Sequence, residues 1–165
     1  FTDDVFKWET DASRAFISTG SGTFNEGVIG LGLTDQDQGR GVVCADFDND
    51  GDVDIFIWIS SDTIGGRLFR NDLNENNFLR IKLIGLPPNT AATGARIRVT
   101  VGATTQLREI SLNSNFISQN PTVQIIGLGT AAQADAVIIE WPDGQVSDLG
   151  SVQANQNLIV DHPGL

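Results

Sequence analysis

Five aspartates fall within the nine residues 46–54, with a glycine among them. Carboxylates this close repel one another: two unit charges about 4 Å apart cost roughly 4 kcal/mol at an effective dielectric of about 20. We therefore expect a cation among the side chains. Carboxylate and carbonyl oxygens are hard donors, and calcium takes about 6–8 of them in a flexible shell. The sequence therefore predicts a calcium-binding loop.

The spacing gives each aspartate a part in the predicted site. The predicted metal ligands are Asp46, Asp48, Asp50, Asp52 and Asp54. Asp52 would offer its backbone carbonyl and the other four their carboxylates. Gly51 stands where the chain must turn sharply, so we expect a positive φ there. The alternatives are a solvated acidic turn, or magnesium, which demands a stricter octahedral shell.

The segments on both sides of this loop favour strands. Residues 55–59, Ile-Phe-Ile-Trp-Ile, are β-branched and aromatic, which predicts a short buried strand. Cys44 lies in the strand that enters the loop, and it is the only cysteine. We expect its thiol to be buried and unreactive, with an intermolecular disulfide as the alternative. The predicted site is therefore strand–loop–strand.

The residues around the loop carry a family resemblance. Residues 39–57, GRGVVCADFDNDGDVDIFI, resemble an FG-GAP/VCBS repeat. GSGTF at 20–24 resembles the hairpin turn that precedes such a loop, and LFRND at 68–72 resembles the strand and turn that follow it. The rest resembles the ASPIC/UnbV domain of the cartilage acidic protein-like family. The segments that carry this second resemblance are FLRIKL (78–83), GARIRV (94–99), QLREI (106–110), SQN (118–120), GLG (127–129), WPDG (141–144) and NQ (155–156). The resemblance implies a calcium-binding propeller-type blade followed by a second domain. Members usually carry several repeats, whereas this chain has one complete repeat.

Hydrophobic alternation predicts an all-β fold. Residues 79–83 and 95–101 alternate apolar with basic or polar side chains, the pattern of half-buried antiparallel strands. Further strands are expected near 104–110, 122–127, 135–141, 145–149 and 157–161, and no helical periodicity is evident. We predict an N-terminal extended arm (1–14), a blade-like antiparallel unit with the calcium loop (15–76) and an antiparallel β-sandwich (77–165).

Composition narrows the classes of partner. The net charge of −11 makes nucleic acid an unfavourable ligand. Residues 1–76 hold 15 acidic and 5 basic side chains, whereas residues 77–165 hold 6 and 5, so the acidity belongs to the half with the loop.

No apolar run reaches the roughly 20 residues that a membrane-spanning helix needs. The chain starts at Phe1, which we interpret as a removed leader or a fragment. Weak calcium modules suit calcium-rich fluid, so we expect an extracellular or cell-surface location.

Other residues are candidates for binding. The basic side chains of the C-terminal half are Arg80, Lys82, Arg96, Arg98 and Arg108. If their strands are neighbours, they form a basic stripe that would dock something acidic, such as the N-terminal half of another copy; an ordinary solvated face is the alternative. Trp58 and Trp141 are expected in the core rather than stacked on sugars. Phe116 is a candidate exposed aromatic residue. Asp35, Asp37 and residues 71–76 favour polar loops over further metal sites.

The sequence offers few candidate catalytic residues. The single histidine, His162, lies in no recognisable catalytic pattern, and the clustered aspartates are explained by calcium binding. We expect a non-enzymatic, calcium-stabilised extracellular structural or adhesion module. A lone blade leaves strand edges that invite pairing between copies, giving a homo-oligomer or filament. Phe6 and Trp8 share one side of a strand over residues 1–10 that could be donated. The residues predicted for assembly are Phe6, Trp8, Arg80, Arg96 and Arg98. The alternative is a carbohydrate- or protein-ligand-binding module of a larger secreted propeller protein.

Overall fold

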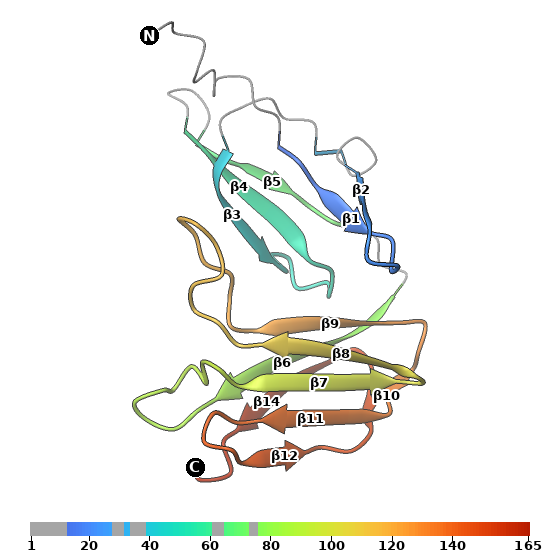
Figure 1. Cartoon of the computed structure of the whole chain (residues 1–165), viewed down its shortest axis with the longest axis vertical. Helices are drawn as coiled ribbons and strands as arrows, with labels where there is room; N and C mark the ends of the chain where they lie inside the picture. Colours follow the sequence, from blue (N-terminus) through green and yellow to red (C-terminus); the bar gives the residue numbers. More distant parts are fainter. Residues whose placement is uncertain (1–12, 28–31, 34–38, 61–64, 73–75) are drawn as a thin grey trace, which may run out of the picture.

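The computed structural model describes residues 13–27, 32–33, 39–60, 65–72 and 76–165, and these residues form strands and loops without a helix (Figure 1). The strands are β1 Phe16–Ser18, β2 Phe24–Glu26, β3 Gly39–Ala45, β4 Asp54–Ile59, β5 Arg67–Phe69, β6 Asn77–Ile84, β7 Arg96–Val101, β8 Thr104–Glu109, β9 Gln124–Gly129, β10 Gln133–Ala134, β11 Ala136–Glu140, β12 Val146–Asp148, β13 Val152–Gln153 and β14 Gln156–Asp161. The predicted all-β class is confirmed. The described residues hold no helix long and apolar enough to cross a bilayer.

The strands before residue 70 form two small antiparallel sheets. β1 and β2 make a hairpin whose turn has positive φ at Gly20 and Gly22, as the turn predicted at residues 20–24 requires. β3, β4 and β5 form a three-stranded meander in that order. β3 and β5 are therefore its two edge strands.

The strands from residue 77 onward form a sandwich. One sheet has the order β12-β11-β7-β8 and the other the order β14-β6-β9. Their inner faces share one core of buried side chains, all of which lie between Leu79 and Val160. The alternation predicted for residues 79–83 and 95–101 is confirmed, because Leu79, Ile81 and Ile97 are completely buried and Val101, at the end of the second segment, is partly buried. The sandwich therefore has a core that needs no residue from β1–β5.

One strand pair departs from the predicted antiparallel sandwich. β14 pairs with β6 in parallel, from Gln156 opposite Leu79 to Asp161 opposite Ile84, whereas the other pairs are antiparallel. Alternation reports which face of a strand is buried and carries no information on the direction of its neighbour. The strand predicted at 157–161 therefore exists, but its direction comes from the tertiary structure. Phe6 and Trp8 lie outside the described residues.

The prediction of a core position is right for Trp141 and wrong for Trp58. Trp141 is 3% exposed, whereas Trp58 is 53% exposed. Trp58 lies opposite Gly41 on β3, and its ring lies over Gly65. Neither glycine has a side chain to cover the indole. The strand predicted as buried at 55–59 is therefore buried on one face only, where Ile57 and Ile59 lie.

The sequence left two interpretations of the basic residues open, a single stripe or an ordinary solvated face, and the structure excludes the single stripe. The predicted members were Arg80, Lys82, Arg96, Arg98 and Arg108. The first two lie on β6, whereas the other three lie on β7 and β8, in the opposite sheet. In addition, Arg108 is opposite Ile97 and so shares its inward face. The five side chains therefore face three different ways.

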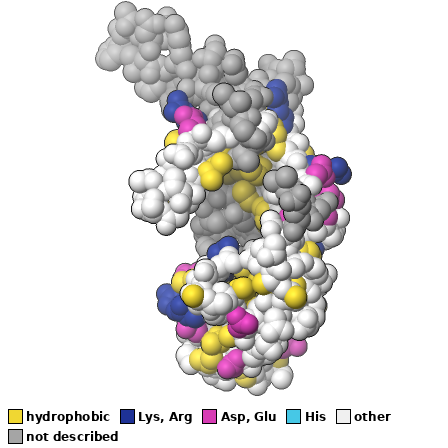
Figure 2. All heavy atoms as spheres, turned by 90° about the vertical axis from the view of Figure 1, so that its right-hand side faces the viewer, with side chains coloured by type: hydrophobic (Ala, Val, Ile, Leu, Met, Phe, Trp, Pro, Cys, Tyr) yellow, Lys and Arg dark blue, Asp and Glu magenta, His cyan; other side chains and the backbone are white. Residues whose placement is uncertain are grey.

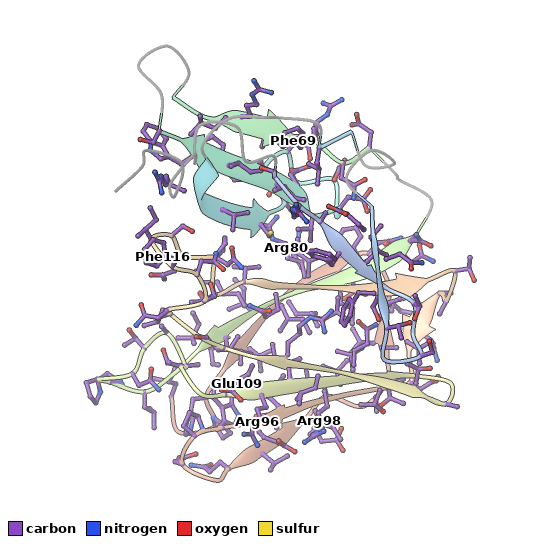
Figure 3. The ribbon with its side chains drawn as sticks, turned by 45° about the horizontal axis from the view of Figure 1, so that its top comes forward. Phe69, Arg80, Arg96, Arg98, Glu109 and Phe116 are labelled. Atoms are coloured by element: carbon purple, nitrogen blue, oxygen red, sulfur yellow. The ribbon has the colours of Figure 1, made fainter. Side chains whose placement is uncertain are left out.

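Two of these arginines are paired within the chain. Arg96 Nε lies 3.2 Å from Glu109 Oε2, and Arg98 Nε lies 2.8 Å from Glu140 Oε1 (Figure 3). The hydrogen bond from Arg98 lowers the pKa of Glu140 below its usual value. On the face shown in Figure 2, basic and acidic side chains are interspersed. Arg80, Arg96 and Arg98 therefore do not form one docking surface.

Candidate metal centre and its seat on the sandwich

The aspartate loop connects two paired strands. β3 ends at Ala45, β4 begins at Asp54, and these two residues are opposite one another in the register. The intervening segment must therefore reverse the chain while carrying four of the five aspartates. This confirms the predicted strand–loop–strand arrangement.

Three of the aspartates converge. Asp46, Asp48 and Asp50 each offer a carboxylate oxygen, and these oxygens all lie within 4.8 Å of one another. Asp46 is buried, Asp50 half-buried and Asp48 exposed, so the group opens from the interior toward solvent. A set made only of carboxylate oxygens is the donor chemistry that calcium prefers. The residues present therefore fit the predicted ion.

Backbone amides fold the loop around Asp46. The amide of Asp50 donates to Asp46 Oδ1 at 3.1 Å, and the amide of Gly51 donates to Asp46 Oδ2 at 3.2 Å. The amide of Asp52 donates to Asp50 Oδ1 at 3.0 Å. Gly51 has φ +100°, which confirms the predicted left-handed turn, and Asn49 has φ 65°.

Asp54 holds the two ends of the loop together. It is completely buried, its Oδ2 accepts from the amide of Phe47 at 2.8 Å, and its Oδ1 accepts from the amide of Asn71 at 2.8 Å. It therefore joins the start of the loop, β4 and the segment after β5. Asp54 and Asp52 lie outside the group of three converging carboxylates, so their predicted metal-binding parts stay predictions.

The loop carries unfavourable negative charge. The pKa of Asp48 is raised by desolvation, by Asp50 and by Asp54, and the pKa of Asp52 is raised by desolvation and then by the neighbouring aspartates. Two guanidinium groups approach the loop. Arg70 NH1 lies 3.7 Å from Asp48 Oδ2, and Arg80 NH1 lies 3.6 Å from Asp46 Oδ2. These cations supply part of the positive charge that the sequence predicts.

The aspartate loop packs against the outer face of β6. Arg80 also donates to Asn49 Oδ1 and lies between the meander and the sandwich (Figure 3). Phe78, two residues earlier on the same face, packs against Gly51. A Cβ at position 51 would lie 2.0 Å from Phe78 Cε1, so only glycine allows this approach.

Comparison with family models accounts for both halves of the chain. A model of the FG-GAP-like repeat matches residues 2–57, and a model of the ASPIC and UnbV family matches residues 85–164. The chain carries an FG-GAP-like repeat followed by an ASPIC and UnbV domain. This confirms the resemblance seen in the sequence, and the match to the repeat includes the whole aspartate loop. None of the curated proteins compared with the chain matches it.

The ASPIC and UnbV domain also closes the outer edge of β3. The amide of Val42 donates to Ser118 Oγ at 3.0 Å, and the Val42 carbonyl accepts from Ser118 Oγ at 2.6 Å and from Asn115 Nδ2 at 2.7 Å. The amide of Cys44 donates to Asn120 Oδ1 at 2.9 Å. These side chains belong to the loop between β8 and β9, which reaches up beside β3 in Figure 1. They take the place of a neighbouring strand.

Sequence analysis matched Ser118–Asn120 to the family but assigned these residues no part. Their polarity is the expected polarity of a loop, and their partners lie 76 residues away in the chain. Only the fold of the two halves brings them together. Nearby, Phe116 is 90% exposed, which confirms it as an exposed aromatic residue. Cys44 is half-buried rather than buried, and desolvation raises the pKa of its thiol, which favours the predicted unreactive cysteine.

The other candidate positions add little to the site. Asp35 and Asp37 lie outside the described residues. In the oxygen-rich segment 71–76, the amide of Asn71 binds Asp54, and Asp72 pairs with Arg70 at 2.8 Å. Residues 73–75 of that segment also lie outside the described residues.

Both ring nitrogens of His162 are engaged. Nδ1 accepts from the amide of Gly164 at 3.0 Å, so Nε2 carries the proton and donates to Asp143 Oδ2 at 3.1 Å. The buried ring also stands edge-on to Trp141, with ring centroids 4.8 Å apart. In this arrangement His162 holds the C-terminal segment in place, and neither of its ring nitrogens is free to activate a nucleophile.

Proposed function

We propose that the chain is a non-enzymatic, calcium-stabilised extracellular structural module that takes part in adhesion or assembly. The convergence of Asp46, Asp48 and Asp50 on a loop seated against the sandwich carries this proposal. The match to an FG-GAP-like repeat supports it and favours an extracellular location, where calcium is plentiful.

Calcium would have a structural role here. It would be held by the carboxylates of Asp46, Asp48 and Asp50, with the carbonyl of Asp52 and the carboxylate of Asp54 completing the shell. The ion offsets carboxylate repulsion, so its binding free energy adds to the stability of the folded loop. Because the loop lies on β6, this stability is shared with the contact between the two halves.

Thermal unfolding tests the calcium role. We expect EDTA to lower the melting temperature of the full chain and added calcium to restore it, because calcium at about 100 times its Kd adds roughly 2.7 kcal/mol. The double variant Asp48→Asn/Asp50→Asn should lose this response. Asp161→Asn, an exposed carboxylate in the sandwich, is the control and should keep it. An unchanged melting temperature under chelation contradicts the proposal.

Assembly between copies would use strand edges of the repeat. One edge of the meander, β3, is already covered by side chains of the β8–β9 loop, which leaves β5 as the other edge strand of that sheet. A donated strand over residues 1–10, with Phe6 and Trp8 on its apolar side, would add to an edge of another copy and give a homo-oligomer or filament. Head-to-tail contacts give a filament when the rotation between successive copies does not close, and a ring when it does.

Deleting residues 1–10 tests the assembly. We expect the intact chain to form oligomers in calcium, seen by light scattering and negative-stain microscopy, and the shortened chain to stay monomeric. The double variant Phe6→Ser/Trp8→Ser should behave like the deletion, because it removes the apolar side of the donated strand. Equal assembly by the intact and shortened chains contradicts strand donation.

A further inference from the structure

A cavity of about 420 Å³, lined by both polar and apolar side chains, lies between the FG-GAP-like repeat and the sandwich. The repeat contributes the end of β3 and part of the aspartate loop, and the sandwich contributes β6, the end of β8, the start of β9 and the β8–β9 loop. Ligand pockets are commonly about 300–1,000 Å³ and lie preferentially between domains. Neither the family matches nor the proposed calcium site accounts for this cavity.

Arg108 supplies an uncompensated charge to the cavity wall. Its guanidinium donates to the Leu107 carbonyl at 3.1 Å and to Gln106 Oε1 at 3.2 Å, and both acceptors are neutral. Arg96 and Arg98, on the neighbouring strand, each have a carboxylate partner, but Arg108 has none among the described residues. Arg108 is half-buried on the inward side of its strand, where loss of water raises the cost of an unpaired charge. An anion in the cavity would offset this cost.

The β8–β9 loop adds neutral hydrogen-bond donors to the same wall. Asn120 Oδ1 accepts from both Cys44 and Asn115, which fixes the amide orientation and leaves its NH₂ group to donate. Ser114 Oγ accepts from the Asn120 amide at 3.2 Å, so its hydroxyl proton remains to be donated. Ser111 lines the cavity beside them. The part of the wall formed by Arg108 and the β8–β9 loop is therefore rich in donors, which favours a ligand rich in acceptor oxygens. The two carboxylates in the lining are each paired, Asp46 with Arg80 and Glu109 with Arg96.

From this arrangement we infer that the cavity binds a small hydroxylated carboxylate, of the class of the uronic acids. The carboxylate pairs with Arg108, whose planar guanidinium matches it in a two-pronged hydrogen bond. The hydroxyl groups of the sugar pair with Ser111, Ser114 and Asn120. Arg80 also lines the cavity, but it is held by Asp46 and Asn49 and is not needed for this charge balance. Asp46 borders both the cavity and the proposed calcium site, whereas Arg108, Ser111, Ser114 and Asn120 line the cavity and are not among the proposed calcium ligands.

Titration with sodium glucuronate tests the inference. The full chain in calcium is titrated with glucuronate and, separately, with glucose, which lacks the carboxylate; amide NMR spectra locate the binding. We expect glucuronate to shift the amides of Ser114 and Asn120, and glucose to bind at least about tenfold more weakly, because it leaves Arg108 unpaired. Equal binding of the two sugars overturns the inference, as does the absence of glucuronate binding.

Variants separate the Arg108 contact from general attraction of anions. Arg108→Gln should weaken glucuronate binding about tenfold or more. Lys82→Gln removes a positive charge from an exposed position outside the cavity and should leave binding unchanged. If Arg108→Gln does not fold, Arg108→Lys replaces it, and loss of the two-pronged bond should still weaken binding several-fold. Inorganic phosphate that binds as tightly as glucuronate, or binding that Arg108 variants leave unchanged, overturns the assignment.

Discussion

At the scale of single residues, Gly51 connects the aspartate loop to the sandwich. Its φ of +100° belongs to a turn that L-residues rarely adopt, and the Phe78 ring occupies the space where a side chain would begin. Asn49 also has positive φ, but its side chain is used, since it accepts from Arg80. The turn therefore needs a residue without a side chain at position 51 and a polar side chain at position 49.

We predict that Gly51→Ala destabilises the chain more than a positive φ alone explains. Gly144→Ala is the matched control, because Gly144 has φ +89° and open space around its Cα. The control should cost about 1–2 kcal/mol, and Gly51→Ala should cost at least about 1 kcal/mol more because the Phe78 ring must move. Urea unfolding in calcium measures both. Equal losses would show that the loop does not depend on the Phe78 contact.

Asp143 provides a pH-dependent contribution to stability. Its pKa is lowered by the hydrogen bond from the Gln145 amide and by the one from His162. A carboxyl whose folded pKa is lowered stabilises the protein above its unfolded pKa, about 3.9, and loses that contribution as the pH falls further.

We therefore predict that Asp143→Asn is less stable than the parent chain at pH 7 and that the difference shrinks below about pH 4. Unfolding in urea at several pH values between 7 and 2.5 measures this. Asp161→Asn is the control, since its side chain forms no hydrogen bond with the described residues. A stability difference that stays constant down to pH 2.5 contradicts the prediction.

At the scale of elements, the outer edge of β3 is closed by side chains rather than by a strand. The amide and carbonyl of Val42 are bound by Ser118 and Asn115, and the amide of Cys44 is bound by Asn120. An unpaired edge is a template for pairing with another chain, so this contact both joins the two halves and blocks one route to association.

We predict that Asn120→Ala speeds hydrogen exchange at the Cys44 amide, because that amide loses its acceptor. The loss of stability should be about 1 kcal/mol, since the amide is partly buried. Gln119→Ala, at an exposed position of the same loop, is the control. Exchange at Cys44 that is the same in the variant and the control would mean that the side-chain contact does not protect β3.

At the scale of the whole molecule, the two halves are stabilised differently. The core cluster lies wholly within the sandwich of residues 77–165, whereas few large side chains of the described repeat, such as Ile57 and Ile59, are buried. The repeat instead uses hydrogen bonds around the aspartates and its contacts with β6 and the β8–β9 loop. Calcium would act on this half.

We predict that residues 77–165 fold alone and unfold cooperatively, with a midpoint that neither calcium nor EDTA changes. The intact chain, in contrast, should lose stability in EDTA. Calorimetry of the fragment and of the intact chain measures both. A fragment that is unfolded, or that responds to calcium like the intact chain, contradicts the assignment of calcium stabilisation to the repeat.

Short sequence patterns predicted the structural features that depend only on residues close together in the chain. The alternate aspartates before Gly51 indicated a loop with converging carboxylates, because ligands and turn lie within nine residues. Alternation at 79–83 and 95–99 indicated buried faces, because the period of a strand is two residues. Trp58 was mispredicted from its apolar neighbours in sequence, whereas its exposure follows from glycines on β3 and after β4.

By itself, the sequence determined that this chain is all-β, that it carries an acidic loop suited to calcium between two strands, and that a repeat precedes a second domain. The tertiary structure decided how these parts meet. It placed β14 parallel to β6, separated the five basic residues, set the loop on Phe78 and Arg80, and closed β3 with Ser118 and Asn120. Each of these depends on residues far apart in the chain, and the pattern of one strand holds no record of which strand lies beside it.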